Sequence, residues 1–251
     1  MTEIRIHKNI FKEYPDFRRG IIVAKKIQNH GHSQELSAKL NQAITQSASE
    51  PIDVKTDSRI IVWNQAHRQF NSNPNKFPPA HSALLKRVQK PGARIPFINK
   101  VVAIMNYNSI IDVMPVGGDA VIEAEGSLEL CYANGNEIFR PLGNPENVEH
   151  PDPGEIIYMV SDSGEVMCRR WNWRNGHTTR ITEDTHTIVM NIDGLGEDSE
   201  KRTIITRDRV AGMLEEFCHA HTIITILSPS QPVYQFDIWK LGFVNRRTII
   251  I

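Results

Sequence analysis

The chain has 251 residues, of which 40% are hydrophobic and 23% charged, a composition that fits one large globular domain or two small packed lobes; we take it as one. Its apolar stretches are too short for a membrane-spanning helix, and its first 20 residues lack the apolar segment of a secretory signal, which predicts a cytoplasmic location and no membrane partner. The 29 lysine and arginine residues equal the 29 aspartate and glutamate residues, which excludes a strong long-range field, so any contact with nucleic acid must be local.

The N-terminal half predicts one strand followed by helices. Residues 19–26 are a short β-branched run and predict a buried opening strand. Residues 33–47 predict an amphipathic helix with Ser33 as its N-cap. A second helix is expected at 82–90, and a third within 97–114.

After Ala120 the sequence changes to short β-like pieces separated by glycine-containing turns. A strand is predicted at 185–192, a helix at 207–221, and a strand directly after it. We therefore predict an α+β fold in one compact domain, residues 1–228, with β-sheets in the C-terminal two-thirds covered by several helices. Residues 229–251 form a tail that fits either an edge strand or a poorly ordered segment.

The first candidate site is the segment 94–120, in which a polar-centred helix leads into a Pro-Val-Gly-Gly-Asp turn. Gly117 and Gly118 would expose backbone N–H groups and let a ligand approach closely. Asn106 supplies a donor and an acceptor where polar residues predict a break in the helix. Such a turn could hold a carbonyl or a ribose; the alternative is a simple tight turn before a strand.

The second candidate site is the segment 168–185. If it is a strand, Trp171 and Trp173 place both rings on one face, with Arg170, Asn172 and Arg174 on the other. Aromatic planes with guanidinium groups hold nucleotides by stacking and by bidentate phosphate bonds. In the alternative interpretation, the rings fill the core and the arginines pair with acidic residues. The densest positive cluster of the chain lies here, and we expect it to bind a phosphate: Arg169, Arg170, Arg174 and Arg180, with His177 between them.

Other catalytic or metal-binding patterns are missing from the sequence. Its three cysteines have no CxxC spacing, and its histidines show no paired-ligand spacing, so neither a metal site nor a disulfide framework is expected. The sequence contains no GxSxG, P-loop or GxGxxG motif, and no cofactor is predicted. Cys168 lies beside two arginines but has no identified base, and we interpret it as structural.

These two segments, in this order, resemble the B3/B4 tRNA-binding domain, the editing domain of the phenylalanyl-tRNA synthetase beta subunit. Residues 98–107 (INKVVAIMNY) are similar to a family helix reading INNVVDVTNY, and PVGGDA is similar to the turn PLHAFD that follows it. The resemblance spans about 57–193. Trp63 and the stretch 168–174 (CRRWNWR) are typical of free-standing members. The resemblance implies a β/β/α layered fold.

The function implied by this resemblance is trans-editing, the hydrolysis of an amino acid from a wrongly charged tRNA by a protein separate from the synthetase. The implied partner is a tRNA acceptor end or an aminoacyl-tRNA. The family has a His where Gly117 stands and a substrate-reading Glu where Met190 or Asn191 falls, so the pocket is not tuned to tyrosine in the same way. The residues expected to act in catalysis are Asn106, Gly117, Gly118 and Asp119, and those expected to bind substrate are Arg169, Arg170, Trp171, Asn172, Trp173 and Arg174.

An aminoacyl ester is already activated, so a positioned water and an oxyanion held by the backbone N–H groups of Gly117 and Gly118 are sufficient for the hypothesis of a deacylase. Arg170 and Arg174 would hold a phosphate or the polar group of the substrate. Two alternatives remain. One is a non-catalytic module that binds an RNA end or an amino-acid-like ligand in the same groove. The other is a structural interaction protein, expected if Arg170 and Arg174 are salt-bridged on a convex surface.

Overall fold

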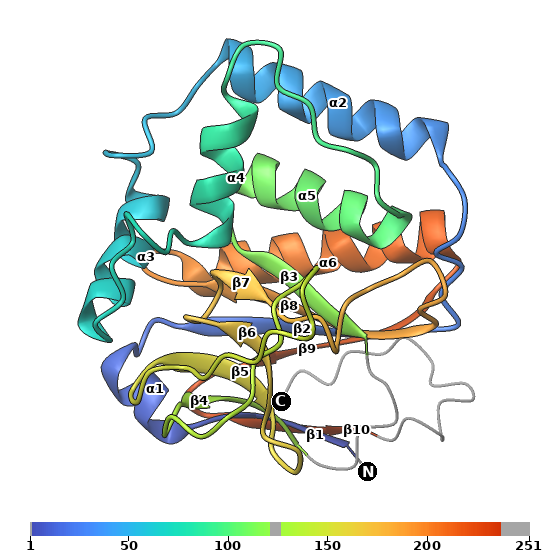
Figure 1. The fold of residues 1–251 in the computed structure, drawn as a ribbon. Coiled ribbons are helices and arrows are strands. Elements are labelled where there is room, and N and C mark those ends of the chain that lie inside the picture. The colour runs from blue at the N-terminus through green and yellow to red at the C-terminus, as the bar shows by residue number, and fades with distance from the viewer. Residues whose placement is uncertain (1, 121–126, 237–251) are drawn as a thin grey trace.

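The fold has three layers, as the computed structural model of residues 2–120 and 127–236 shows (Figure 1). A layer of helices lies on one face of a four-stranded sheet, and a six-stranded sheet lies on the other face. The four-stranded sheet has the order β3-β8-β2-β9, and the six-stranded sheet has the order β10-β1-β4-β5-β6-β7. The strands are β1 (Thr2–Ile6), β2 (Arg18–Lys25), β3 (Val116–Ala120), β4 (Ser127–Tyr132), β5 (Ile156–Val160), β6 (Glu165–Arg169), β7 (Arg174–Asn175), β8 (Thr187–Gly194), β9 (His221–Leu227) and β10 (Val233–Phe236).

Helices α5 and α6 lie against the outer face of the four-stranded sheet, and α2 and α4 pack on α5 (Figure 1). The other two, α1 and α3, contribute Ile10, Phe11 and Trp63 to the core between the sheets. The helices span α1 (Lys8–Glu13), α2 (Gln34–Ser49), α3 (Ser58–Gln69), α4 (Ala80–Val88), α5 (Lys100–Asp112) and α6 (Ser199–Cys218).

Strand β2 separates two hydrophobic cores, because successive side chains of a strand point to opposite faces of the sheet. Ile22 and Ala24 pack with the helices, and Ile21 and Val23 pack with the six-stranded sheet. Both faces of the four-stranded sheet are therefore buried. This explains why residues 19–26 read as an apolar run without alternation.

The predicted α+β layered architecture is confirmed, and so are the strand at 19–26 and the α2 helix. Ser33 accepts a hydrogen bond from the Leu36 amide and caps α2 as expected. The expectation that the sheets occupy the C-terminal two-thirds was too narrow. β1 comes first in the chain and pairs in parallel with β4, so the N-terminus belongs to the six-stranded sheet.

Two further expectations need correction. The helix predicted at 207–221 begins eight residues earlier, at Ser199. The helix α5 has no break, because the Asn108 amide donates to the Ile104 carbonyl and the Ser109 hydroxyl to the Met114 carbonyl. One of the two alternatives for the tail holds for Val233–Phe236, which forms an edge strand paired with β1; the tail beyond residue 236 lies outside the described residues.

Within residues 2–120 and 127–236, no helix combines the length and the apolar character needed to cross a bilayer.

Candidate functional site

A cavity of about 400 Å³ lies where the edges of the two sheets meet, between β3 of the four-stranded sheet and β7 of the six-stranded sheet. Its volume is within the range of small-molecule sites, about 300–1,000 Å³. The two segments singled out in the sequence line it together, although about 50 residues separate them. The lining residues are Ala80, Ala83, Leu84, Arg87, Met105, Asn106, Ser109, Pro115, Val116, Gly117, Gly118, Asp119, Tyr158, Cys168, Trp171, Asn172, Trp173, Asn175, Asn191 and Asp193.

The glycine segment is strand β3 rather than a turn, and its two glycines face different ways. A Cβ atom on Gly117 would meet no atom within 4 Å, whereas one on Gly118 would lie 2.5 Å from the Met190 sulfur. A side chain at 117 would therefore enter open space, while a side chain at 118 would enter the packed face below the helices.

The backbone groups of β3 also alternate. The Pro115 carbonyl accepts from the Asp193 amide, and the Ala120 amide donates to the Thr179 carbonyl, away from β8. In an antiparallel pair the N–H and C=O of one residue point to the same side, and the side alternates along the strand. The Gly118 N–H therefore lies on the free edge of the sheet, and the Gly117 N–H faces β8. The expectation that both amides point to a ligand is wrong for Gly117.

The expectation of a strand through 170–174 is also wrong. β6 ends at Arg169, and Arg170 and Trp171 adopt the left-handed conformation, with φ of 48° and 65°. Left-handed backbone is unfavourable for residues other than glycine, so external contacts must hold it. The Trp171 amide donates to the Ile156 carbonyl at 2.6 Å, and the Arg170 amide donates to the Glu155 carboxylate at 3.0 Å.

This turn separates the roles of the two tryptophans. Trp171 is fully buried and packs edge-on against Trp63 at 5.0 Å and Phe17 at 4.9 Å, so it fills the core and only borders the cavity. Trp173 is half-buried and packs against Phe77 at 4.7 Å. The two rings do not form one stacking platform, and the core-filling alternative describes Trp171.

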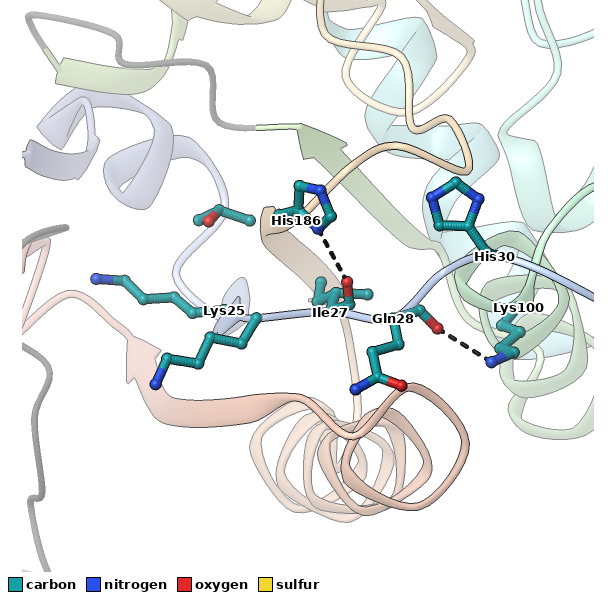
Figure 2. Close-up of a pocket in the computed structure, with 8 residues that line it drawn as sticks. Lys25, Ile27, Gln28, His30, Lys100 and His186 are labelled. Carbon is teal, nitrogen blue, oxygen red and sulfur yellow. Dashed lines mark hydrogen bonds between the residues drawn. The ribbon is translucent and has the colours of Figure 1, made fainter.

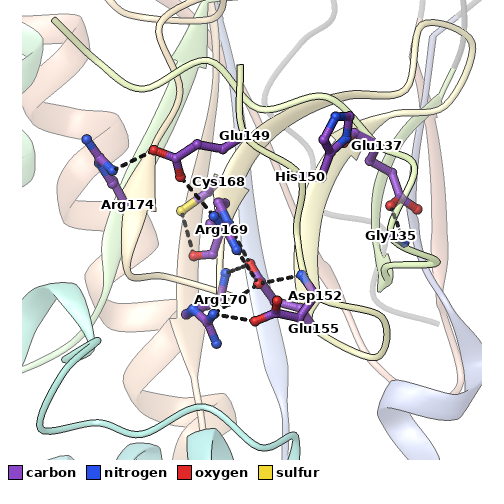
Figure 3. Close-up of polar contacts among 10 residues, drawn as sticks. All are labelled: Gly135, Glu137, Glu149, His150, Asp152, Glu155, Cys168, Arg169, Arg170 and Arg174. Atoms are coloured by element: carbon purple, nitrogen blue, oxygen red, sulfur yellow. Dashed lines mark hydrogen bonds and ion pairs between the residues drawn. The ribbon is translucent and has the colours of Figure 1, made fainter. Parts of the chain in front are cut away.

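Three of the four arginines expected to bind a phosphate are paired with carboxylates instead (Figure 3), and the fourth, Arg180, donates to the His177 carbonyl. Arg169 forms ion pairs with Glu155 at 2.8 Å and with Glu149 at 2.9 Å. Arg170 pairs with Asp152 at 2.7 Å, and Arg174 lies 3.5 Å from Glu149. None of the three lines the cavity. Their contacts match the alternative in which the arginines pair with acidic residues.

The floor of the cavity is a buried polar network. The Thr179 hydroxyl donates to Asp119 at 2.7 Å, and the Asn191 amide lies 3.5 Å from the other Asp119 oxygen. The Arg19 Nε donates to Asn191 Oδ1 at 3.1 Å. Arg19 is fully buried, and its Nη1 has no hydrogen-bond partner in the part of the chain that the structure describes.

A second buried carboxyl group, Asp193, lines the cavity beside this network. The Tyr158 hydroxyl lies 2.8 Å from both oxygens of Asp193, and Arg19 lies over the Tyr158 ring at 4.4 Å. Burial raises the pKa of Asp193 to about 6, against the opposing effect of the Arg19 charge. Burial likewise raises the pKa of Asp119 to about 6, and the hydrogen bond from Thr179 opposes the shift. Both carboxyl groups therefore change charge close to neutral pH.

Asn172 is held in position from behind. Its Oδ1 is 3.2 Å from the His67 Nε2, and burial lowers the pKa of His67 to about 4, so the ring is neutral at pH 7. Its backbone carbonyl accepts from the Ala80 amide at the start of α4. Among the described residues the Asn172 Nδ2 has no hydrogen-bond partner. A buried amide donor without a partner at a cavity wall is suited to a polar group of a ligand.

Residues 62–218 match the model of the B3/4 domain family, a match that covers most of the chain and every lining residue of the cavity. The chain belongs to this family. The resemblance of its motifs to the B3/B4 domain is thereby confirmed. No curated protein sequence matches the chain at a significant level.

This B3/4 domain also has a similar solved structure, an N-terminal fragment of the phenylalanyl-tRNA synthetase beta subunit from Pyrococcus horikoshii. The two share 9% sequence identity, with a TM-score of 0.40. The likeness covers 89% of this chain and 54% of the other, so the chain spans about half the length of that fragment.

Seven of the ten residues singled out in the sequence line the cavity: Asn106, Gly117, Gly118, Asp119, Trp171, Asn172 and Trp173. Sequence reasoning missed Arg87, Tyr158 and Asp193. Asp193 had a signal, because Asn191 and Asp193 are polar at alternate positions of an otherwise apolar strand. Tyr158 and Arg87 had none, since only the tertiary fold brings β5 and α4 to the cavity.

No group of three or more His, Cys, Asp or Glu side chains in the described ranges is placed to hold a metal ion. Cys168 reaches the cavity, but burial raises the pKa of its thiol well above the ordinary value. A neutral thiol is a poor nucleophile, which agrees with the interpretation of Cys168 as structural.

Proposed function

We propose that this protein hydrolyses the ester bond of wrongly charged aminoacyl-tRNA as a free-standing editing enzyme. Membership of the B3/4 family and the similarity of residues 57–193 to a synthetase editing domain support a substrate at the tRNA acceptor end. The observation that carries the proposal is one cavity in which a buried carboxyl group, an edge-strand N–H and the Asn172 Nδ2, which has no partner among the described residues, lie together.

In the proposed reaction, Asp119 accepts a proton from a water molecule that attacks the ester carbonyl. Its pKa of about 6 lies close to neutral pH, where a general base is both ionised and still basic enough to take a proton. The Gly118 N–H, on the free edge of β3, donates to the developing oxyanion. The bond between the carbonyl carbon and the ribose oxygen then breaks, and the ribose hydroxyl leaves with the proton.

Positioning the ester is assigned to the polar groups around this pair. Asn106 on α5 and Asn172 present amide groups to the cavity, where they would orient the α-amino group or the attacking water. Arg87 on α4 is the arginine that lines the cavity, with one Nη bonded to the Arg94 carbonyl. We assign to Arg87 the phosphate contact that the sequence suggested for Arg170 and Arg174.

The test is deacylation of a panel of mischarged tRNAs by the purified protein at low salt. We expect ester loss from at least one of them, and loss of that activity in Asp119→Asn. If the wild-type protein leaves every ester intact while it binds the same tRNAs, the hydrolase assignment is wrong.

A non-catalytic binding module is the second candidate, and the charge pairing favours it. Arg169, Arg170 and Arg174 are occupied by carboxylates, which reduces the positive charge available near the cavity. This candidate predicts tight binding of an aminoacyl-adenosine with its ester unchanged by mass spectrometry. The deacylase predicts free amino acid in the same sample.

A further inference from the structure

A second pocket, of about 660 Å³, lies at the start of β8, whereas the cavity is lined by the later β8 residues Asn191 and Asp193. Figure 2 shows the residues that line this second pocket. Its titratable lining residues are all basic: Lys25, Lys26, His30, Lys100 and His186. No Asp or Glu of the described residues lines it, in a chain whose charges balance overall. We call this feature the basic pocket.

The ends of the neighbouring helices do not compensate the positive charge of the basic pocket. Lys100 is the first residue of α5, where the positive end of the helix dipole makes a cation unfavourable, and the first turn of α5 holds no acidic residue. The C-terminus of α6 is close, since the Gln28 amide donates to the Cys218 carbonyl. That terminus carries only about half a negative charge, which is less than the charge of Lys26 and Lys100 together.

The polar contacts of Lys100 and His186 hold these side chains without neutralising them. The Lys100 ammonium donates to the Gln28 carbonyl, a neutral group, at 3.1 Å. His186 approaches the Ile27 carbonyl through its Nδ1 at 3.3 Å. His30 differs, because its Nε2 lies 3.3 Å from an Asp184 oxygen, whose negative charge would offset a positive charge on the histidine ring. The charge of the pocket is therefore carried by Lys26 and Lys100.

The basic side chains lie in a row rather than around one point. Figure 2 shows them following the chain from Lys25 to His30, with Lys100 joining from α5 and His186 from the segment before β8. A row of basic side chains suits a strand with repeated negative charges better than it suits a single ion. The pocket residue Thr187 is four residues from the cavity residue Asn191 on β8, a distance of about 13 Å.

We propose that the basic pocket binds the phosphate backbone of a single-stranded RNA end whose terminal nucleotide reaches the cavity. The inference rests on the proposed function for the identity of the RNA. Lysine binds phosphate as a point charge, so the contact is independent of sequence and sensitive to salt. The basic pocket would supply affinity for the RNA and orient its end, and the cavity would hydrolyse the ester.

The experiment compares Lys26→Gln/Lys100→Gln with the control Lys8→Gln/Lys201→Gln, which removes two lysines outside the pocket. The probe is a fluorescein-labelled single-stranded RNA with the sequence of a tRNA acceptor end. We expect the pocket variant to bind severalfold more weakly and the control to bind like wild type. The slope of log affinity against log salt should fall by about 0.7 for each phosphate that the pocket variant no longer binds.

Two further measurements, with a morpholino oligomer and with inorganic phosphate, identify the source of any effect. The same sequence on an uncharged morpholino backbone should bind no more tightly to wild type than to the pocket variant. Unchanged RNA affinity and salt slope in the pocket variant would overturn the inference. So would binding of inorganic phosphate, abolished in the pocket variant, by a wild-type protein that binds no RNA.

Hydrolysis of a small aminoacyl-adenosine ester, which is too short to reach the pocket, separates this inference from the proposed function. The pocket variant should cleave that ester at the wild-type rate. If no ester is cleaved by either protein while RNA binding still depends on Lys26 and Lys100, the editing proposal fails and the pocket assignment stands.

Discussion

At the scale of single residues, the cavity concentrates groups that cost folding stability. Asp119 and Asp193 are both buried, and burial raises the pKa of each to about 6. Keeping two such carboxyl groups beside the buried Arg19, with a donor that has no partner among the described residues, is unfavourable unless a ligand uses them. These residues therefore fit the ligand site that we propose.

Asp119→Asn should abolish ester hydrolysis. The variant should also lose less folding stability than wild type as the pH rises. The pKa of Asp119 is raised from 3.8 to about 6 on folding, so the folded state binds more protons between these values and stability falls as pH rises through them. A shift of this size corresponds to roughly 2–3 kcal/mol above pH 6. Urea denaturation at pH 4.5 and pH 7.5 measures this difference in the free energy of unfolding. The control is Glu146→Gln, a substitution of an exposed residue. An equal pH dependence in wild type and variant would contradict the prediction.

The neighbouring glycines provide a matched pair of substitutions. Gly117→Val should leave the melting temperature near that of wild type and block hydrolysis, because its side chain enters the open cavity. Gly118→Ala should destabilise the protein by about 1–2 kcal/mol, because its methyl group would displace the Met190 sulfur. Thermal denaturation and deacylation of both variants check this, and a larger loss of stability in Gly117→Val would refute the assigned faces of β3.

At the scale of elements, the left-handed turn after β6 depends on one carboxylate. Glu155 is almost fully buried and accepts hydrogen bonds from the Arg169 side chain and the Arg170 amide (Figure 3). The ion pairs thus position Asn172 and Trp173 at the cavity. Arginines that do not line the cavity thus still determine the position of residues that do.

Glu155→Ala should destabilise the protein by about 3–5 kcal/mol, because it leaves the Arg169 guanidinium buried without its main partner. Glu149→Ala should cost much less, since the Glu149 side chain is 29% exposed and water can replace it. The free energy of unfolding in urea distinguishes the two variants. Equal losses would mean that the turn is held by other contacts.

The same elements show what the sequence could predict. Local sequence signals were sufficient to predict β2 and the Ser33 cap of α2. The order of the motifs along the chain was sufficient to predict that two distant segments line one cavity. The turn at 170–171 was not predictable, because it depends on Glu155 and Ile156 from another part of the chain. The density of arginines along the chain did not predict the exposed positive charge. Ion pairs with carboxylates neutralise the arginines of residues 169–174, while lysines from β2 and α5 come together in the basic pocket.

At the scale of the whole molecule, the cavity joins both sheets and the helical layer, so a bound ligand should stabilise all three. Its walls come from β3, β5, α4, α5 and the turn after β6. Every one of these elements must be in place for the cavity to exist. Ligand affinity is therefore coupled to global folding rather than to one loop.

A non-hydrolysable amide analogue of aminoacyl-adenosine should raise the melting temperature of the wild-type protein in a single transition. At a concentration one hundred times its Kd, the stabilisation is about 2.7 kcal/mol, or roughly 5–10 °C for a domain of this size. Gly117→Val should show no shift, because its side chain occupies the cavity without disturbing the sheets. The Lys26→Gln/Lys100→Gln variant should shift as much as wild type, because the analogue lacks the phosphates that the basic pocket binds. If the analogue still raised the melting temperature of Gly117→Val, the ligand would bind outside this cavity. The buried carboxyl groups would then have no part in binding it.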